Sequence, residues 1–161
     1  MGEHFFLVKS IYFDKRKERN WYVNWHQDRS INVKEKGTYP GYSGWTAKED
    51  YHGVLPPVSL SKNIVTLRVH LDDCAAEQGA LQLLPNTHER HYDDTAIAHL
   101  AKEATPVSCT VNKGDVLLMK PLTLHSSPEN STQRRRRVLH LEFSNQDLPQ
   151  GLEWAEKELV H

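Results

Sequence analysis

Hydrophobic and polar side chains alternate along much of the chain with the two-residue period of a β-strand. The clearest runs are short, rich in β-branched residues and bounded by Gly, Pro, Asn or Asp. We predict strands at residues 21–33, 63–73, 81–88, 107–111, 115–120 and 136–143. A helix is predicted at residues 93–104, and a helical turn in the tail at 148–160.

The remaining segments are expected to be loops. Residues 1–19 are mixed and charged and indicate a short strand or a loop. Residues 34–63 are rich in Gly, Pro, Ser and Tyr and predict a long loop, of a kind that is usually functional or disordered. Mainly antiparallel strands with one short helix favour a β-barrel or sandwich, and 161 residues suffice for a single domain of this kind.

Composition narrows the classes of function. With 20 basic and 21 acidic residues, charge gives no reason to expect binding to nucleic acid or to an anionic membrane. No apolar run approaches the roughly 18 residues of a membrane span, and the start, MGEHFFLVKS, does not have the pattern of a secretory signal. Cys74 and Cys109 lack CxxC spacing and are predicted to be free thiols in a reducing cytoplasm.

The first candidate for chemistry is the His-x-Asp pair at the end of the 21–33 run. Strand alternation places His26 and Asp28 on the same face, with Tyr22 and Asn24. An imidazole beside a carboxylate suits a divalent metal, as in the two-histidine, one-carboxylate sites of non-haem iron oxygenases. A hydrogen-bonded pair that only stabilises the strand end is the alternative. The best candidate for a second histidine ligand is His125, in KPLTLHSSPENS.

The second candidate is an arginine that follows. Arg136 lies eleven residues after His125 and opens a predicted strand, in which Val138 and His140 share its face. An arginine fixed on that face suits bidentate binding of a carboxylate. The preceding Arg134 and Arg135 are equally consistent with a solvated edge or an anion-binding patch.

With these residues in place, the sequence resembles the phytanoyl-CoA dioxygenase family of Fe(II)/2-oxoglutarate-dependent oxygenases. The resemblance covers residues 20–154 and rests on four segments in family order: NWYVNWHQD, LRVHLDDCAAEQGALQLLPNTH, GDVLLMKPLTLHSS and RRVLHLEF. It implies a double-stranded β-helix, the jelly-roll or cupin-like barrel, with few short helices. It also implies hydroxylation of a small-molecule substrate with Fe(II), 2-oxoglutarate and O₂.

The resemblance also assigns roles to residues. His26, Asp28 and His125 would hold the iron, and Arg136 would bind the distal carboxylate of 2-oxoglutarate. The resemblance also assigns Ser127, Gln27 and Trp45 to the pocket that binds 2-oxoglutarate. A cupin-like Zn²⁺ or Mn²⁺ enzyme with the same ligands but no need of Arg136, or a non-catalytic barrel derived from an oxygenase, are the alternatives.

Two departures from the family pattern lead to expectations. PNTH stands at 85–88 where the family usually has PGSH, and since Asn can also adopt a left-handed turn, we expect little consequence. Only 25 residues precede His26, so residues 1–161 are expected to be a single barrel domain without the upstream helices of the family. The apolar row Trp21, Val23 and Trp25 would then be partly exposed, or buried against a second copy in a homo-oligomer.

Four further polar residues have less certain roles. Arg68 and His70 share a face with Thr66 and would contact substrate or co-substrate if that face lines the barrel. His140 is expected to be either a partner of a metal ligand or a core histidine. Lys48, in the long loop, is a candidate contact for an anionic substrate.

Overall fold

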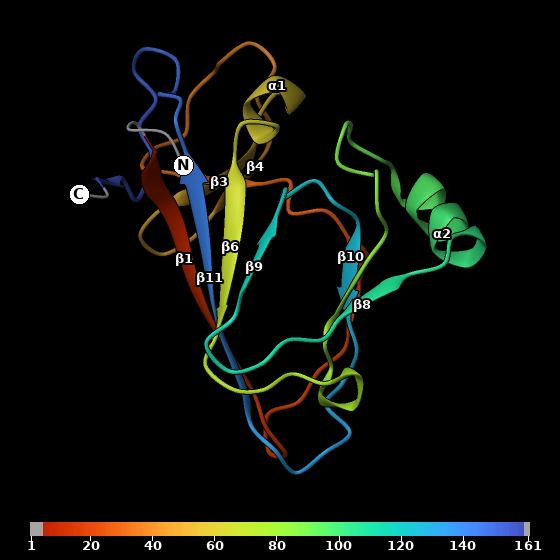
Figure 1. Ribbon diagram of the computed structural model, residues 1–161. Coiled ribbons are helices and arrows are strands. Elements are labelled where there is room, and N and C mark those ends of the chain that lie inside the picture. The colour runs from red at the N-terminus through yellow and green to blue at the C-terminus, as the bar shows by residue number, and fades with distance from the viewer. Residues whose placement is uncertain (1–4, 160–161) are drawn as a thin grey trace.

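The computed structural model describes residues 5–159, whose strands form two larger antiparallel sheets and a smaller third (Figure 1). The five-stranded sheet has the order β12 (Glu158–Leu159), β1 (Phe6–Lys15), β11 (Arg136–Ser144), β6 (Val65–His70) and β9 (Val116–Met119). The four-stranded sheet has the order β2 (Val23–His26), β10 (His125–Ser127), β7 (Leu81–Leu83) and β8 (Val107–Cys109). The third has the order β3 (Ile31–Val33), β5 (His52–Leu55) and β4 (Ser43–Ala47).

Helices are few and short. They are α1 (Val58–Ser61), one 3₁₀ turn (Ala76–Gln78) and α2 (Asp94–Glu103). The α2 helix begins where the Asp93 side chain accepts a hydrogen bond from the Ala96 N–H at 2.8 Å. It lies against the outside of the four-stranded sheet (Figure 1). No helix of residues 5–159 is long and apolar enough to cross a membrane. The predicted mainly β fold is confirmed.

The inner face of the five-stranded sheet is polar. Alternate residues of β11 are buried: Arg136, Val138, His140, Glu142 and Ser144. β1 pairs with one side of β11, with Lys15 opposite Arg136, and β6 pairs with the other, with Arg68 opposite His140. Strand register thus brings several charged side chains into the interior.

Two apolar clusters hold the fold together. The larger packs the third sheet and the C-terminal segment onto the five-stranded sheet: Phe6, Val8, Ile31, Val33, Val54, Leu60, Ile64, Leu152 and Trp154. The smaller lies under α2, where Leu84, Ile97 and Leu124 pack with Trp25. The polar interior between the two larger sheets is therefore flanked by these apolar clusters.

Several local predictions were wrong because pairing partners distant in sequence decided the structure. Residues 21–33 form two strands in different sheets, β2 and β3, and residues 34–63 hold β4, β5 and α1 in place of a long loop. The tail pairs as β12 and makes a bridge from Trp154 to Val33, with no helix through residue 159.

The predicted apolar row on β2 does not share one face. Ser127 pairs with Val23 while His125 pairs with His26, so an irregularity in β2 shifts the alternation. Trp21 and Val23 therefore line the interior with His26, whereas Trp25 packs under α2. The homo-oligomer expected through this row stays a prediction. On the five-stranded sheet, large apolar side chains are exposed elsewhere, at Tyr12, Val116, Leu118 and Leu159.

Two finer expectations are met. Asn86 has a φ of 62°, the left-handed turn that Asn can adopt in PNTH. Cys74 and Cys109 are both free thiols.

Gly79 follows the 3₁₀ turn with a φ of 75°, and a Cβ there would lie 2.5 Å from the backbone oxygen of Pro128. We expect Gly79→Ala to lower the free energy of unfolding by about 2–4 kcal/mol, from left-handed strain and a clash in a packed region. Gly114→Ala is the control, since Gly114 has a φ of 93° but nothing within 4 Å of the added Cβ. Urea unfolding measures both, and equal losses would show that the close approach has no energetic role.

Candidate metal centre and cation-lined cavity

A cavity of about 140 Å³ lies between the two larger sheets. Its lining comes from β1, β2, β6, β7, β10 and β11 and the segments beside them. The lining residues are Ile11, Phe13, Lys15, Trp21, Val23, His26, Asp28, Arg68, Leu81, His125, Ser127, Arg136 and His140. The cavity thus contains both sequence motifs, the His-x-Asp pair with His125 and the strand opened by Arg136.

Three side chains converge at one end of this cavity. His26 ends β2 and His125 begins β10, and the two residues are cross-strand partners with ring centroids 4.1 Å apart. Asp28 follows β2, where its N–H donates to the Pro121 carbonyl at 3.0 Å. The Asp28 carboxylate lies 3.5 Å from His26 Nε2 and 3.4 Å from His125 Nε2.

The hydrogen bonds of the two rings fix which nitrogen faces the carboxylate. His26 Nδ1 lies 2.7 Å from the Asn24 carbonyl and His125 Nδ1 lies 2.8 Å from the Thr123 carbonyl. A carbonyl only accepts, so each Nδ1 carries the hydrogen and each Nε2 directs a lone pair at Asp28. Asp28 Oδ2 is buried and has no hydrogen-bond partner. The Nε2 lone pairs of His26 and His125 thus face the Asp28 carboxylate, and a positive charge placed between the three groups would stabilise them.

A divalent metal fits that arrangement. Ligand atoms bound at about 2.1 Å and at right angles lie about 3 Å apart, and the ligand atoms of His26, Asp28 and His125 all lie within 4.8 Å of one another. Backbone carbonyls on the Nδ1 atoms are the usual partners of metal-binding histidines. The sequence-derived trio is therefore assembled and oriented as a candidate metal site.

His140 lies beside the trio but is arranged differently. Its Nδ1 accepts a hydrogen bond from Arg68 Nη1 at 2.8 Å, so its Nε2 carries the hydrogen. That Nε2 faces Glu142 Oε1 at 3.2 Å and Asp28 Oδ2 at 3.9 Å. Glu142 is also paired with the buried Lys9 at 3.0 Å. Because its Nε2 is a donor, His140 is a neighbour of the candidate metal site and does not face it as a ligand.

The charges around Asp28 favour its ionised form. Burial raises the pKa of this carboxyl, but the neighbouring His125 and the contact with His26 outweigh burial and hold the pKa well below its usual range. Burial lowers the pKa of His125 to about 4, so its imidazole is neutral at pH 7. Burial also opposes protonation of His26, but contact with Asp28 raises its pKa overall. A carboxylate and a neutral imidazole are the forms that bind metals.

The other end of the cavity is strongly cationic. Arg136 is 2% exposed, and its Nη1 donates to the Gly79 carbonyl at 2.5 Å and to Ser127 Oγ at 3.3 Å. Lys15 Nζ donates to the same Oγ at 2.9 Å and to the Pro128 carbonyl at 2.7 Å. Arg136 Nε has no partner. Among residues 5–159, no carboxylate lies within ion-pair distance of Lys15 or Arg136, so this end is suited to an anion from solution.

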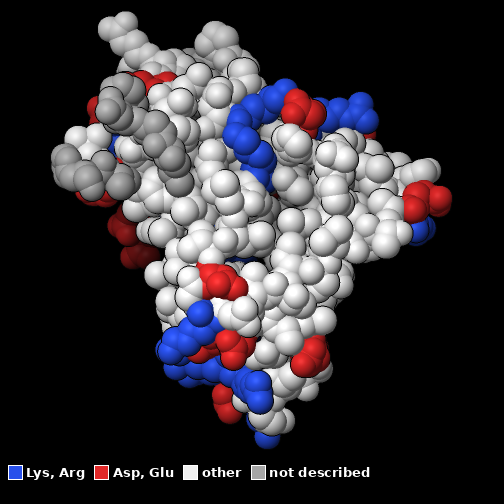
Figure 2. Space-filling view, viewed as in Figure 1, with Lys and Arg blue, Asp and Glu red and all other residues white. Residues whose placement is uncertain are grey.

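Arg134 and Arg135 are placed outside. Both are exposed, and Arg135 pairs with Asp14 at 2.7 Å. They lie on the connection between β10 and β11, at the tapered end of the molecule, where Figure 2 shows basic and acidic side chains gathered together. Only Arg136 of these three arginines reaches the cavity.

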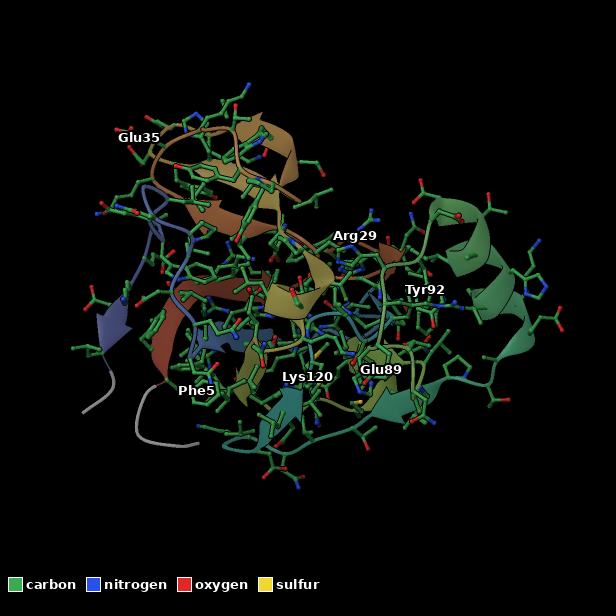
Figure 3. All side chains as sticks on the ribbon, turned by 90° about the horizontal axis from the view of Figure 1, so that it is seen from above. Phe5, Arg29, Glu35, Glu89, Tyr92 and Lys120 are labelled. Atoms are coloured by element: carbon green, nitrogen blue, oxygen red, sulfur yellow. The ribbon has the colours of Figure 1, made fainter. Side chains whose placement is uncertain are left out.

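Two residues that the family resemblance assigned to the 2-oxoglutarate pocket lie outside the cavity lining. The buried Gln27 donates to the Leu122 carbonyl at 2.6 Å and accepts from the Tyr92 N–H at 3.0 Å, so it ties two loops together on the far side of β2. Arg29 Nη1 donates to the Tyr92 carbonyl at 3.3 Å; both residues are labelled in Figure 3. Trp45 packs on the larger apolar cluster. Ser127 lines the cavity and Gln27 and Trp45 do not, so a co-substrate role for Gln27 and Trp45 stays a prediction.

Of the four further polar residues named from the sequence, two line the cavity and two do not. Arg68 and His140 line the cavity. His70 is buried on the same face of β6 without lining it, and Lys48 is exposed in the turn after β4. Sequence reasoning missed Lys15, although the alternation Ile11, Phe13, Lys15 was the available signal. The charged run after Lys15 hid that signal, because it resembles a loop.

Comparison with known proteins identifies a protein family and individual proteins to which this chain is similar. A model of the phytanoyl-CoA dioxygenase family matches residues 4–138, a span that holds the trio and Arg136. A methylphosphonate hydroxylase from Gimesia maris is 31% identical over 124 residues, which are 71% of this chain and 45% of that protein. The chain therefore spans less than half the length of this curated relative.

Solved structures share the fold. Iron-bound EctD from S. alaskensis has a TM-score of 0.64 and 18% identity, covering 89% of this chain and 46% of that one. The epimerase SnoN, in complex with Fe³⁺, alpha ketoglutarate and nogalamycin RO, has a TM-score of 0.62 and 17% identity, covering 98% and 62%. AviO1 from Streptomyces viridochromogenes Tue57 has a TM-score of 0.62 and 22% identity, covering 87% and 51%. The predicted cupin-like fold is confirmed.

We expect Asp28→Asn to weaken binding of a divalent metal, because a neutral amide replaces the carboxylate between two imidazole lone pairs. The loss should exceed the roughly 10- to 100-fold caused by changes around metal ligands. Calorimetric titration with Mn²⁺ measures it. Asp93→Asn, which keeps the cap of α2, is the control and should bind like the unaltered protein. Unchanged affinity in a folded Asp28→Asn protein would exclude Asp28 as a ligand.

A second expectation concerns the cost of burying Lys15. Burial, with the charges of Arg136 and Arg68, lowers the pKa of Lys15 from 10.5 to about 7. Between these values the unfolded chain binds a proton that the folded chain lacks, so stability falls as pH falls from 10.5 to 7. Lys15→Met should therefore stabilise the ligand-free protein at pH 7, by about 1–4 kcal/mol, and flatten this dependence.

Urea unfolding at several pH values between 7 and 10 tests that expectation. Lys17→Met is the matched control, since Lys17 is exposed two residues further along the chain. If Lys15→Met and Lys17→Met show the same pH dependence, Lys15 is not held unfavourably in the folded state.

Proposed function

The chain belongs to the phytanoyl-CoA dioxygenase family, and we propose that it is an Fe(II)- and 2-oxoglutarate-dependent oxygenase that hydroxylates a small molecule. The main support for the proposal is that one cavity contains both a set of metal-ligand atoms without a metal ion's charge between them and a set of buried cations. Two imidazole lone pairs and an unpartnered carboxylate oxygen meet at one end. Buried cations that have no carboxylate partner among residues 5–159 occupy the other end. A metal and a dicarboxylate would satisfy both.

The roles of the metal-binding residues follow from their contacts. His26, Asp28 and His125 would hold Fe(II) and leave its remaining positions open to the cavity. Iron bound there supplies the activation of O₂ that couples oxidation of 2-oxoglutarate to hydroxylation of a C–H bond. The Asn24 and Thr123 carbonyls keep both rings turned with Nε2 toward the metal. His140 Nε2 lies 3.9 Å from Asp28 Oδ2 and would help to hold that carboxylate in its ionised form.

The co-substrate would extend from the metal to the cationic end. Arg136 would bind the distal carboxylate through its guanidinium, helped by Ser127 and Lys15, which already contact one another. These groups stand on paired strands, since Lys15 is directly opposite Arg136 in β1 and β11. Rigid strands fix the length available between the carboxylate site and the metal, which favours one dicarboxylate over shorter or longer ones.

The size and the apolar walls of the cavity also restrict which substrates can bind. Its volume of about 140 Å³ is below that of an ordinary ligand pocket, which favours a small substrate. Its apolar walls, from Phe13, Trp21, Val23 and Leu81, would exclude water around a reacting C–H group. Since a relative at 31% identity is a methylphosphonate hydroxylase, we propose methylphosphonate as the first substrate to test.

We expect Arg136→Ala to weaken 2-oxoglutarate binding by about 1.5–3 kcal/mol, the contribution of a charge-assisted hydrogen bond. Arg135→Ala is the control, because Arg135 is exposed and pairs with Asp14 outside the cavity. Its affinity should be unchanged. Calorimetric titration of the Mn²⁺-loaded proteins with 2-oxoglutarate measures both.

The same titration separates the alternatives. If Arg136→Ala and Arg135→Ala behave alike, Arg136 is not the carboxylate anchor. If the unaltered protein binds metal but no 2-oxoglutarate, a cupin-like metalloenzyme with another reaction replaces the oxygenase. Succinate formed from 2-oxoglutarate in the presence of Fe(II) and O₂ would support the proposed reaction directly.

A further inference from the structure

The cavity holds more buried positive charge than the distal carboxylate of one co-substrate requires. Lys15, Arg68 and Arg136 all line it, and Asp28 is the one carboxylate of its described lining. A divalent metal and a 2-oxoglutarate dianion would cancel each other, so two arginines, and Lys15 where its pKa of about 7 leaves it protonated, would still face a single carboxylate. Unpaired buried charge is costly in a low-dielectric interior, and binding a further anion relieves that cost.

Arg68 stands apart from the other two cations. Lys15 and Arg136 both contact Ser127, at the end of β11 where these strands pair. Arg68 is paired across the sheet with His140, four residues further along β11. At a rise of about 3.3 Å per residue, the backbones of Arg136 and His140 lie about 13 Å apart along β11, although the Arg136 and Arg68 charges still act on one another. His140 is the neighbour of Asp28, so Arg68 lies at the level of the candidate metal site.

The guanidinium of Arg68 is buried and only partly used. The residue is 4% exposed, and its Nη1 makes one hydrogen bond, to His140 Nδ1 at 2.8 Å. Its Nε is buried without a partner. The guanidinium stacks over the Phe13 ring at 5.5 Å, which holds it in place. No carboxylate in residues 5–159 pairs with it. A guanidinium held in this way presents a fixed set of donors to an oxyanion.

We propose that Arg68 anchors the anionic group of the primary substrate, so that this site selects a small organic oxyanion. The inference rests on the proposed function and names the substrate class of the same site. With its oxyanion on Arg68, the substrate would place its carbon beside Phe13, whose ring contacts both Arg68 and His140. Burial and the charge of Arg136 lower the pKa of Arg68 to about 10, which still leaves it charged at pH 7.

Binding of methylphosphonate by the full chain, loaded with Mn²⁺ and saturated with 2-oxoglutarate, tests the proposal by calorimetry. We expect the unaltered protein to bind methylphosphonate, Arg68→Gln to bind it at least tenfold more weakly, and the neutral dimethyl ester of methylphosphonate not to bind. Arg134→Gln is the matched control, because Arg134 is exposed outside the cavity. Arg68→Lys keeps the charge, is used if Arg68→Gln does not fold, and should also bind more weakly.

Titration of the same proteins with 2-oxoglutarate distinguishes this inference from the proposed function. Near-normal 2-oxoglutarate affinity in Arg68→Gln, with loss of methylphosphonate binding, supports Arg68 as the substrate anchor. Loss of 2-oxoglutarate affinity with methylphosphonate binding retained would assign Arg68 to the co-substrate and overturn the inference. It is equally overturned if the unaltered protein binds 2-oxoglutarate but neither methylphosphonate nor acetate. Failure of the unaltered protein to bind 2-oxoglutarate would instead contradict the proposed function.

Discussion

Buried charge that the chain does not neutralise is the feature on which the rest of this structure depends. Lys15, Arg68 and Arg136 point into the interior between two sheets, and Asp28 is the acidic residue of the described cavity lining. A domain selected for stability alone would place apolar side chains there, because unpaired buried charges cost free energy. The apolar clusters under α2 and beneath the third sheet offset that cost. Their separation from the cavity lets the fold tolerate a polar interior.

Much of the candidate site could be predicted from sequence because it follows local rules. Alternation along residues 136–143 placed Arg136 and His140 on one face, and both are buried there. The spacing of His26 and Asp28 located the carboxylate, and the fold brought His125 to them. The left-handed turn that Asn can adopt was noted for PNTH, and Asn86 adopts it.

The sequence-based predictions failed where pairing between strands distant in sequence overrides the local pattern of apolar and polar residues. The irregularity in β2 turns Val23 and His26 to the same side, which strict alternation forbids. Residues 34–63, which resemble a loop, become strands because β5 pairs with β3 and β4. Gln27 and Trp45 were assigned by likeness to a family motif, and their co-substrate role stays a prediction, since hydrogen bonds to loop carbonyls hold Gln27, and apolar packing holds Trp45. Lys15 went unnoticed because the charged run after it resembles a loop, and its pairing with Arg136 makes its inward direction plain.

The central claim is that one cavity binds iron and 2-oxoglutarate together. The most direct measurement is the visible absorption spectrum of the protein under anaerobic conditions, with Fe(II), with 2-oxoglutarate, and with both. Chelation of Fe(II) by the keto and carboxylate oxygens of 2-oxoglutarate gives a broad charge-transfer band that neither component gives alone. The account predicts this band for the unaltered protein with both components, and its loss in Asp28→Asn. A folded, Fe(II)-bound protein that shows no band at saturating 2-oxoglutarate would contradict the account.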